Sequence, residues 1–189
     1  MIGALPTSLE VGGRDWDIRS DYRNILTIFE ALEDKELTDE EKLYITLLRV
    51  YVDFEKMDKD CYKEAYEKAS KFIECHERQE EKKNPKLINW QKDEQMIFPA
   101  INAVAGCEVR ALEYMHWWTF LGYFESVDNE SLWSFVLSIR QKRSKGKKLE
   151  KYEQEFFTKN PDLCSIEWKA PSKKTEEQLN DLFASLPEG

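Results

Sequence analysis

The residues best suited to acid–base or metal chemistry in this chain are its two histidines, His76 and His116. An imidazole near neutral pH can carry a proton or bind a metal ion, and Cys75 places a thiol directly before His76. Neighbouring positions on a helix point about 100° apart, so Cys75 and His76 cannot easily share one ion. His116 lies within an aromatic run, where a hydrogen-bonded core histidine is the ordinary role. We expect neither histidine to be catalytic or to bind a metal.

Nucleophilic and phosphate-binding chemistry find equally little support. Cys107 and His116 could form a nucleophile–base pair, but no third orienting residue accompanies them. The stretch 143–148 contains a Gly-Lys pair at Gly146, yet it lacks the upstream Gly and the following Ser or Thr of a phosphate-binding loop. Paired carboxylates such as 40–41 and 80–81 lie in charge-rich segments typical of solvated surfaces. The sequence therefore predicts a protein that is not an enzyme, with no catalytic residue, no metal site and no cofactor.

A basic run stands out because the chain as a whole is acidic, with a formal net charge of −9. Three interpretations of this run stay open: a helix end favoured by the macrodipole, a patch for an acidic protein segment, or a local nucleic-acid contact. The acidic field of the whole chain repels phosphates and argues against broad binding to nucleic acid or anionic membranes. We take the following six residues as candidate partner-binding residues: Arg140, Lys142, Arg143, Lys145, Lys147 and Lys148.

Large aromatic side chains precede the basic run. At helical spacing, several of them share one broad face, which could form a ligand platform but is more typical of packing between helices. We expect Trp117 or Trp118 to belong to the core. The aromatics that we expect to line a core or a groove are Tyr114, Trp117, Trp118, Phe120 and Trp133.

The composition predicts a globular and mainly α-helical protein. Hydrophobic residues make up 41% of the chain, while Gly (7) and Pro (6) are scarce. No apolar run is long enough to span a bilayer, and the N-terminus lacks the basic start and apolar core of a secretory signal. The four scattered cysteines favour free thiols over a disulfide framework. These features predict a cytoplasmic protein.

The spacing of hydrophobic residues, together with turn and capping signals, predicts where the strands and helices lie. Two short alternating runs around Gly12-Gly13 predict a β-hairpin over residues 8–19, packed on helices. The pattern Thr38-Asp39-Glu40-Glu41 is a capping box, and Gly106 and Pro161 predict helix ends. Pro99 is expected to kink a helix or to delay its start. The predicted helices cover about 20–32, 38–54, 60–76, 93–105, 110–125, 131–143 and 148–159, with a charged link at 77–86.

We predict a multi-helix bundle over residues 1–165, including the N-terminal hairpin. Residues 166–189 are predicted to form a polar link and a short amphipathic helix. That helix carries its apolar side chains on one face, namely Leu179, Leu182, Phe183 and Leu186.

Four blocks carry a resemblance to a known family. They are the stretch 5–23 with Gly12-Gly13 within it, the stretch 91–106 that begins Gln91-Lys92-Asp93-Glu94-Gln95, His116-Trp117-Trp118-Thr119-Phe120 with its lysine-rich sequel, and Glu153-Gln154-Glu155-Phe156-Phe157. In this order, over roughly residues 5–160, they resemble the phage "gene product fifteen" family. The chain departs from the family pattern in its longer charged link at 77–86 and in Pro99. The segment after Pro161 lies outside the resemblance.

The resemblance implies a tail-morphogenesis protein of long-tailed phages or prophages that infect Gram-positive bacteria. Members of the family are similar to tail assembly chaperones, which coat the tape-measure protein while the tail tube polymerises around it. The implied partners are helical segments of the tape-measure protein, other tail assembly proteins and further copies of the same chain, without a membrane. The implied location is the cytoplasm of the bacterial host, and the resemblance implies no site residue.

Two other functions stay open on the sequence. The chain could be a nucleic-acid-associated or regulatory phage protein that uses the basic segment 140–151, although the acidic net charge weighs against nucleic acid. It could also be a structural tail or neck component that is retained in the virion.

Overall fold

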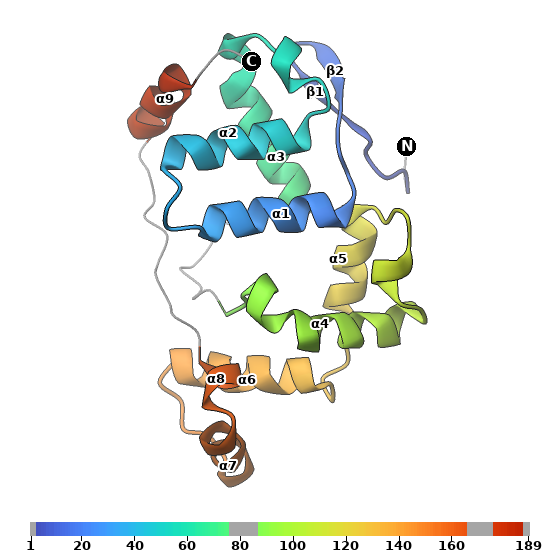
Figure 1. Ribbon diagram of the computed structural model, residues 1–189, viewed down its shortest axis with the longest axis vertical. Coiled ribbons are helices and arrows are strands. Elements are labelled where there is room, and N and C mark those ends of the chain that lie inside the picture. The colour runs from blue at the N-terminus through green and yellow to red at the C-terminus, as the bar shows by residue number, and fades with distance from the viewer. Residues whose placement is uncertain (1–2, 76–86, 166–175, 187–189) are drawn as a thin grey trace. The chain divides into compact units, whose positions relative to one another are not determined.

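A computed structural model describes residues 3–75, 87–165 and 176–186 of the chain (Figure 1). The described residues form two compact units. The first unit contains residues 3–75, 114–120 and 176–186, and the second contains 87–113 and 121–165. The charged link predicted at 77–86 and the polar link predicted at 166–175 lie outside the described residues.

The predicted hairpin is confirmed. Strand β1 (Ser8–Val11) pairs antiparallel with β2 (Arg14–Asp17), with Leu9 opposite Trp16. Gly12 and Gly13 form the turn with φ angles of 59° and 73°, the left-handed region that two-residue hairpin turns require. The Gly12 N–H donates to Glu64 Oε2 at 3.0 Å, which ties the turn to the helix that carries Glu64.

The rest of the first unit is helical and was largely predicted. It contains α1 (Tyr22–Glu33), α2 (Asp39–Val50), the single 3-10 turns η1 (Phe54–Lys56) and η2 (Lys59–Cys61), α3 (Tyr62–Glu74) and α9 (Glu176–Ser185). The predicted capping box is formed, since the Glu41 N–H donates to Thr38 Oγ1 at 3.2 Å and the Thr38 N–H to Glu41 Oε2 at 2.7 Å. Figure 1 shows α1 beside α2, and α2 packs against α3. The fully buried side chains here include Ile25, Ile28, Leu47, Tyr51, Phe54 and Tyr62.

Arg19 closes the C-terminal end of α2. Its guanidinium donates to the Leu48 carbonyl at 2.8 Å, to the Val52 carbonyl at 2.9 Å and also to the Tyr51 carbonyl. The last carbonyls of a helix have no partner within the helix. A side chain from the segment after the hairpin therefore supplies the donors that α2 lacks.

The second unit contains α4 (Trp90–Ala105), the 3-10 turn η3 (Val109–Ala111), α6 (Leu132–Ser144), α7 (Lys151–Lys159) and α8 (Pro161–Cys164). Helix α4 begins at Trp90, earlier than predicted, because Asn89 Oδ1 accepts from the Lys92 N–H at 2.7 Å and caps it. Pro99 lies inside α4 and does not delay its start. Gly106 ends α4 as predicted, with φ 70°. The buried side chains include Ile97, Ile101, Trp133, Val136 and Ile139.

One helix is shorter than predicted. The helix expected over 110–125 begins only at Trp117, as α5 (Trp117–Glu125), with residues 117–120 assigned to the first unit. Before it, the chain is held extended, because the Tyr22 N–H donates to the Met115 carbonyl at 3.0 Å and the Trp117 N–H donates to the Ser20 carbonyl at 2.7 Å. These long-range backbone bonds replace the local bonds that a helix would make.

The fold class is mainly α with a short N-terminal hairpin, as predicted. Among the described residues, no helix combines the length and the apolar character that crossing a membrane requires.

Candidate functional site

The paired tryptophans close the C-terminal end of α3. The indole N–H of Trp117 donates to the Ile73 carbonyl at 2.8 Å, and the indole N–H of Trp118 donates to the Phe72 carbonyl at 2.8 Å. An indole nitrogen can only donate, and the last carbonyls of a helix need donors. The two adjacent indoles therefore act as a cap for α3, which is a structural role.

His116 is held by hydrogen bonds on both ring nitrogens. The Trp118 N–H donates to Nδ1 at 3.0 Å, so Nδ1 is the unprotonated nitrogen. Nε2 then carries the hydrogen and donates to the Pro6 carbonyl at 2.9 Å. His116 is only 3% exposed, which makes it the hydrogen-bonded core histidine expected from the sequence. His76 lies outside the described residues.

The aromatics expected to line a core or groove occupy different environments. Trp117, Phe120 and Trp133 are buried, and Trp118 is half-buried. The Phe120 ring stacks on Tyr22 with 4.3 Å between ring centroids. Tyr114 is 55% exposed, although its hydroxyl lies 2.8 Å from Ser20 Oγ. Of these five aromatics, Tyr114 alone offers most of its surface to solvent.

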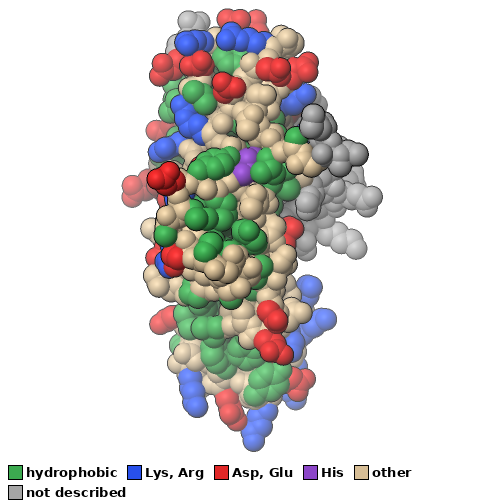
Figure 2. All heavy atoms as spheres, turned by 90° about the vertical axis from the view of Figure 1, so that its right-hand side faces the viewer, with side chains coloured by type: hydrophobic (Ala, Val, Ile, Leu, Met, Phe, Trp, Pro, Cys, Tyr) green, Lys and Arg blue, Asp and Glu red, His purple; other side chains and the backbone are tan. Residues whose placement is uncertain are grey.

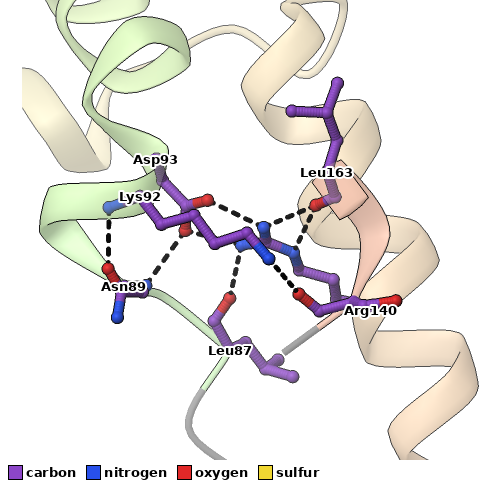
Figure 3. Close-up of polar contacts among 7 residues, drawn as sticks. Leu87, Asn89, Lys92, Asp93, Arg140 and Leu163 are labelled. Atoms are coloured by element: carbon purple, nitrogen blue, oxygen red, sulfur yellow. Dashed lines mark hydrogen bonds and ion pairs between the residues drawn. The ribbon is translucent and has the colours of Figure 1, made fainter. Parts of the chain in front are cut away.

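The first residue of the basic run lies inside the second unit (Figure 3). The Arg140 side chain is 2% exposed and forms a two-pronged ion pair with Asp93, with N–O distances of 2.6 and 2.7 Å. Its guanidinium also donates to the Leu87 carbonyl at 2.9 Å and the Leu163 carbonyl at 2.5 Å. Arg140 was expected among the partner-binding residues, but this burial removes it from any partner surface. The Arg140 side chain connects α6, on which it lies, with α8 and with the N-terminal end of α4.

Asp93 is fully buried and was not predicted as an important residue. One oxygen of Asp93 also accepts from the Asn89 N–H at 3.0 Å, before α4. The sequence did hold a signal. Asp93 precedes Met96 and Ile97 by three and four residues, which places a charge on the apolar face of α4. Arg140, directly after Ile139, is the matching charge in α6.

Two further basic residues of the run also have partners within the second unit. Lys142 Nζ donates to both oxygens of Glu153 at 2.6 and 2.8 Å. The Arg143 guanidinium lies 4.1 Å from the centre of the Phe157 ring and donates to the Cys164 carbonyl at 3.3 Å. These contacts fix α7 and α8 against α6.

The remaining lysines lie on the turn that ends α6. Gly146 has φ 63°, its N–H donates to the Arg143 carbonyl at 3.0 Å, and the Lys147 N–H donates to the Lys142 carbonyl at 2.8 Å. This pattern is a Schellman motif, in which glycine is favoured at the left-handed position. The side chains of Lys145, Lys147 and Lys148, which we call the lysine turn, are exposed and have no ion pair within the described residues.

The lysine turn is a small basic feature of a chain whose net charge is −9. On the face shown in Figure 2, Lys and Arg side chains lie interspersed with Asp and Glu side chains. Three lysines at a helix C-terminus interact favourably with the helix dipole. The arrangement can also attract an acidic surface at low salt.

The contact between Lys142 and Glu153 is expected to weaken in acid. Burial of Glu153 disfavours its charged form, but hydrogen bonds from Lys142 and from the Glu150 N–H outweigh that effect and hold the pKa of Glu153 below its usual value. A carboxyl with a lowered folded-state pKa stabilises the fold above its unfolded pKa of about 4.3 and loses this contribution as the pH falls through the folded pKa.

We therefore expect the stability difference between the unaltered chain and Glu153→Gln to shrink as the pH is lowered from about 6 to about 3. Urea unfolding at each pH measures this difference. A difference that stays constant over that range would contradict the assignment of the stabilising charge to Glu153.

No group of acidic, cysteine and histidine side chains suited to a metal ion occurs within residues 3–75, 87–165 and 176–186. The four cysteines, Cys61, Cys75, Cys107 and Cys164, are free thiols.

Comparison with known proteins gives one match. A family model described as Bacteriophage Gp15 protein matches residues 1–163. Neither the curated proteins nor the solved structures include a match. The matched range includes the hairpin, the tryptophan cap of α3, the Asp93–Arg140 pair and the lysine turn, while α9 lies beyond it.

Proposed function

The chain belongs to the Bacteriophage Gp15 protein family, and from this premise we propose that it is a tail assembly chaperone of a long-tailed phage or prophage. It acts in the cytoplasm of the bacterial host, where it binds helical segments of the tape-measure protein while the tail tube is built. Other tail assembly proteins are its further partners. The observation that carries the proposal is the family match over residues 1–163.

The physical properties of the chain support this role. A tape-measure protein is long and helical, and its apolar stripes need cover until the tube encloses them. A small helical protein offers faces between helices for this purpose. Its net charge of −9 keeps many copies soluble when they crowd along one partner. The activity needs no cofactor.

Co-expression with the tape-measure protein tests the proposal. We expect the soluble fraction of the tape-measure protein to rise severalfold, and a complex of the two proteins to survive size exclusion at low salt. An unrelated helical protein of similar size and net charge serves as the control for unspecific solubilisation. Equal solubility with and without this chain, together with the absence of a complex, would refute the chaperone role.

The lysine turn is proposed as a secondary contact that docks on an acidic surface of a neighbouring copy. Changing Lys145, Lys147 and Lys148 together to Glu is expected to weaken self-association at low salt by about tenfold, since like charges then face each other. Sedimentation velocity at two salt concentrations measures this effect. The matched control changes the same three lysines to Arg and keeps the charge. Unchanged self-association in the Glu variant would leave the lysine turn as a solvated helix end.

The nucleic-acid alternative gains no support from the second unit. Arg140 is buried, and Lys142 and Arg143 have partners within the unit. The lysine turn supplies too few exposed cations for the phosphate contacts that drive nonspecific binding. Salt-sensitive retention on DNA would reopen this alternative.

A further inference from the structure

The C-terminal helix α9 is seated on the first unit through one apolar face. Leu182, Phe183 and Leu186 are 9%, 8% and 2% exposed, while Asp181 and Ala184 face solvent. Helix α9 packs against α2 and α3, and Figure 1 shows it beside α2. The Phe183 ring meets the Tyr66 ring of α3 edge to face, with 5.8 Å between centroids. The face formed by α2 and α3 therefore accepts an amphipathic helix through large apolar anchors.

Helix α9 does not fill this face. A depression of about 300 Å³ lies beside Phe183 along α3. Tyr66 contributes apolar surface to it, and Lys63, Lys71 and Glu74 provide charged side chains along its wall. A longer helix, or one with larger side chains, could make contacts there that α9 does not make.

Helix α9 is also too short to be stable as a helix on its own. It has ten residues, and isolated helices shorter than about 12–15 residues are marginal in water. Its helical state therefore depends on the contacts of Leu182, Phe183 and Leu186. Residues 1–163 match the family, so α2 and α3 lie within the matched range and α9 lies outside it.

We propose that the α2–α3 face is a docking groove for an amphipathic helix of another protein, and that α9 is a built-in competitor which the partner helix displaces. This inference rests on the proposed function, because it assigns the occupant as a helical segment of the tape-measure protein. That segment presents large apolar side chains with the spacing of Leu182, Phe183 and Leu186. The covered groove limits binding to partners that outcompete α9.

A labelled peptide with the sequence of residues 176–186 is the first probe. The full chain carrying Leu182→Ala, Phe183→Ala and Leu186→Ala keeps α2 and α3 but loses the anchors of its own α9. We expect this released variant to bind the peptide at least about tenfold more tightly than the unaltered chain, since its groove is open for a larger fraction of the time. The matched control peptide carries the same three alanines and is expected not to bind.

Two further variants keep this test decisive. Phe183→Ala alone changes the fold least and is expected to give a smaller gain in peptide affinity. Tyr66→Ala, added to the released variant, is expected to reverse the gain, while circular dichroism verifies that each variant is folded. Equal peptide affinity in the released, Phe183→Ala and unaltered chains would overturn the groove.

Tape-measure fragments are the second probe and separate this inference from the proposed function. We expect the released variant to capture them more tightly than the unaltered chain does. If the released variant binds the peptide more tightly but captures no tape-measure fragment, the assignment of the tape-measure protein as the occupant is overturned. Capture of the fragments with equal affinity by both chains would support the chaperone role but overturn the groove. If the unaltered chain forms dimers and Phe183→Ala abolishes them, the occupant of the groove is α9 of a second copy. That result would overturn the proposal that a different protein binds there.

Discussion

Asp93→Ala is expected to lower the free energy of unfolding of the second unit by about 3–5 kcal/mol, because it leaves a buried guanidinium without its counter-charge. The Arg140 side chain is 2% exposed and the Asp93 side chain 0% exposed, so water cannot replace the lost carboxylate without opening the unit. The Asn89 N–H loses its acceptor as well. Urea unfolding measures the loss of unfolding free energy. Hydrogen exchange is expected to show that α4, α6 and α8 lose protection.

The neighbouring residue provides a matched control for this prediction. Glu94 follows Asp93 in the same helix and is exposed, so Glu94→Ala is expected to change stability by less than about 0.5 kcal/mol. A double variant, Asp93→Leu with Arg140→Met, removes both charges and is expected to recover part of the loss. The recovery is incomplete because the Leu87 and Leu163 carbonyls then lack a donor. An Asp93→Ala variant as stable as Glu94→Ala would contradict the assigned role of the pair.

Trp117→Ala is expected to destabilise the first unit by about 3–5 kcal/mol, the usual range for removing a large buried aromatic side chain. The Trp117 ring is 1% exposed and meets the Phe29 ring edge to face, with 5.7 Å between centroids. The substitution also removes the donor to the Ile73 carbonyl. Thermal and urea unfolding measure the loss.

A phenylalanine substitution at Trp118 tests the indole cap of α3 while an aromatic ring stays in place. Trp118→Phe keeps an aromatic ring but removes the indole donor to the Phe72 carbonyl, together with part of the ring that stacks on Phe72. Its expected cost is about 1–2 kcal/mol, because one hydrogen bond and part of the ring packing are lost, while the Phe72 carbonyl still accepts from the Cys75 N–H at 3.3 Å. Losses below about 1 kcal/mol for both Trp117→Ala and Trp118→Ala would instead mark the tryptophans as surface ligands.

Local sequence signals predicted much of the fold. Gly12-Gly13 predicted the hairpin, Thr38 with Glu41 predicted the start of α2, and Gly106 predicted the end of α4. Each of these signals acts through residues a few positions apart, through positive φ or through a capping hydrogen bond. Such signals are visible without knowledge of the tertiary structure.

The remaining features depend on contacts between residues far apart in the sequence. Residues 110–116 were expected to be helical, yet backbone hydrogen bonds that join Met115 to Tyr22 and Trp117 to Ser20 prevent a helix around His116, and no local rule contains that information. Arg140 and Asp93 are 47 positions apart. A charge on an apolar helix face can be noticed from the sequence, but its partner becomes evident only when α4 and α6 are packed.

The tryptophan cap has a consequence for the time course of synthesis. Helix α3 ends at Glu74, but the indole groups that close its end belong to residues 117 and 118. At ribosomal rates the chain needs on the order of 2–9 seconds to add the intervening residues. During that interval the Phe72 and Ile73 carbonyls lack the Trp indole donors, and Pro6 lacks His116. In a nascent chain of this length the C-terminal end of α3 therefore lacks its indole donors and frays more readily than in the completed chain.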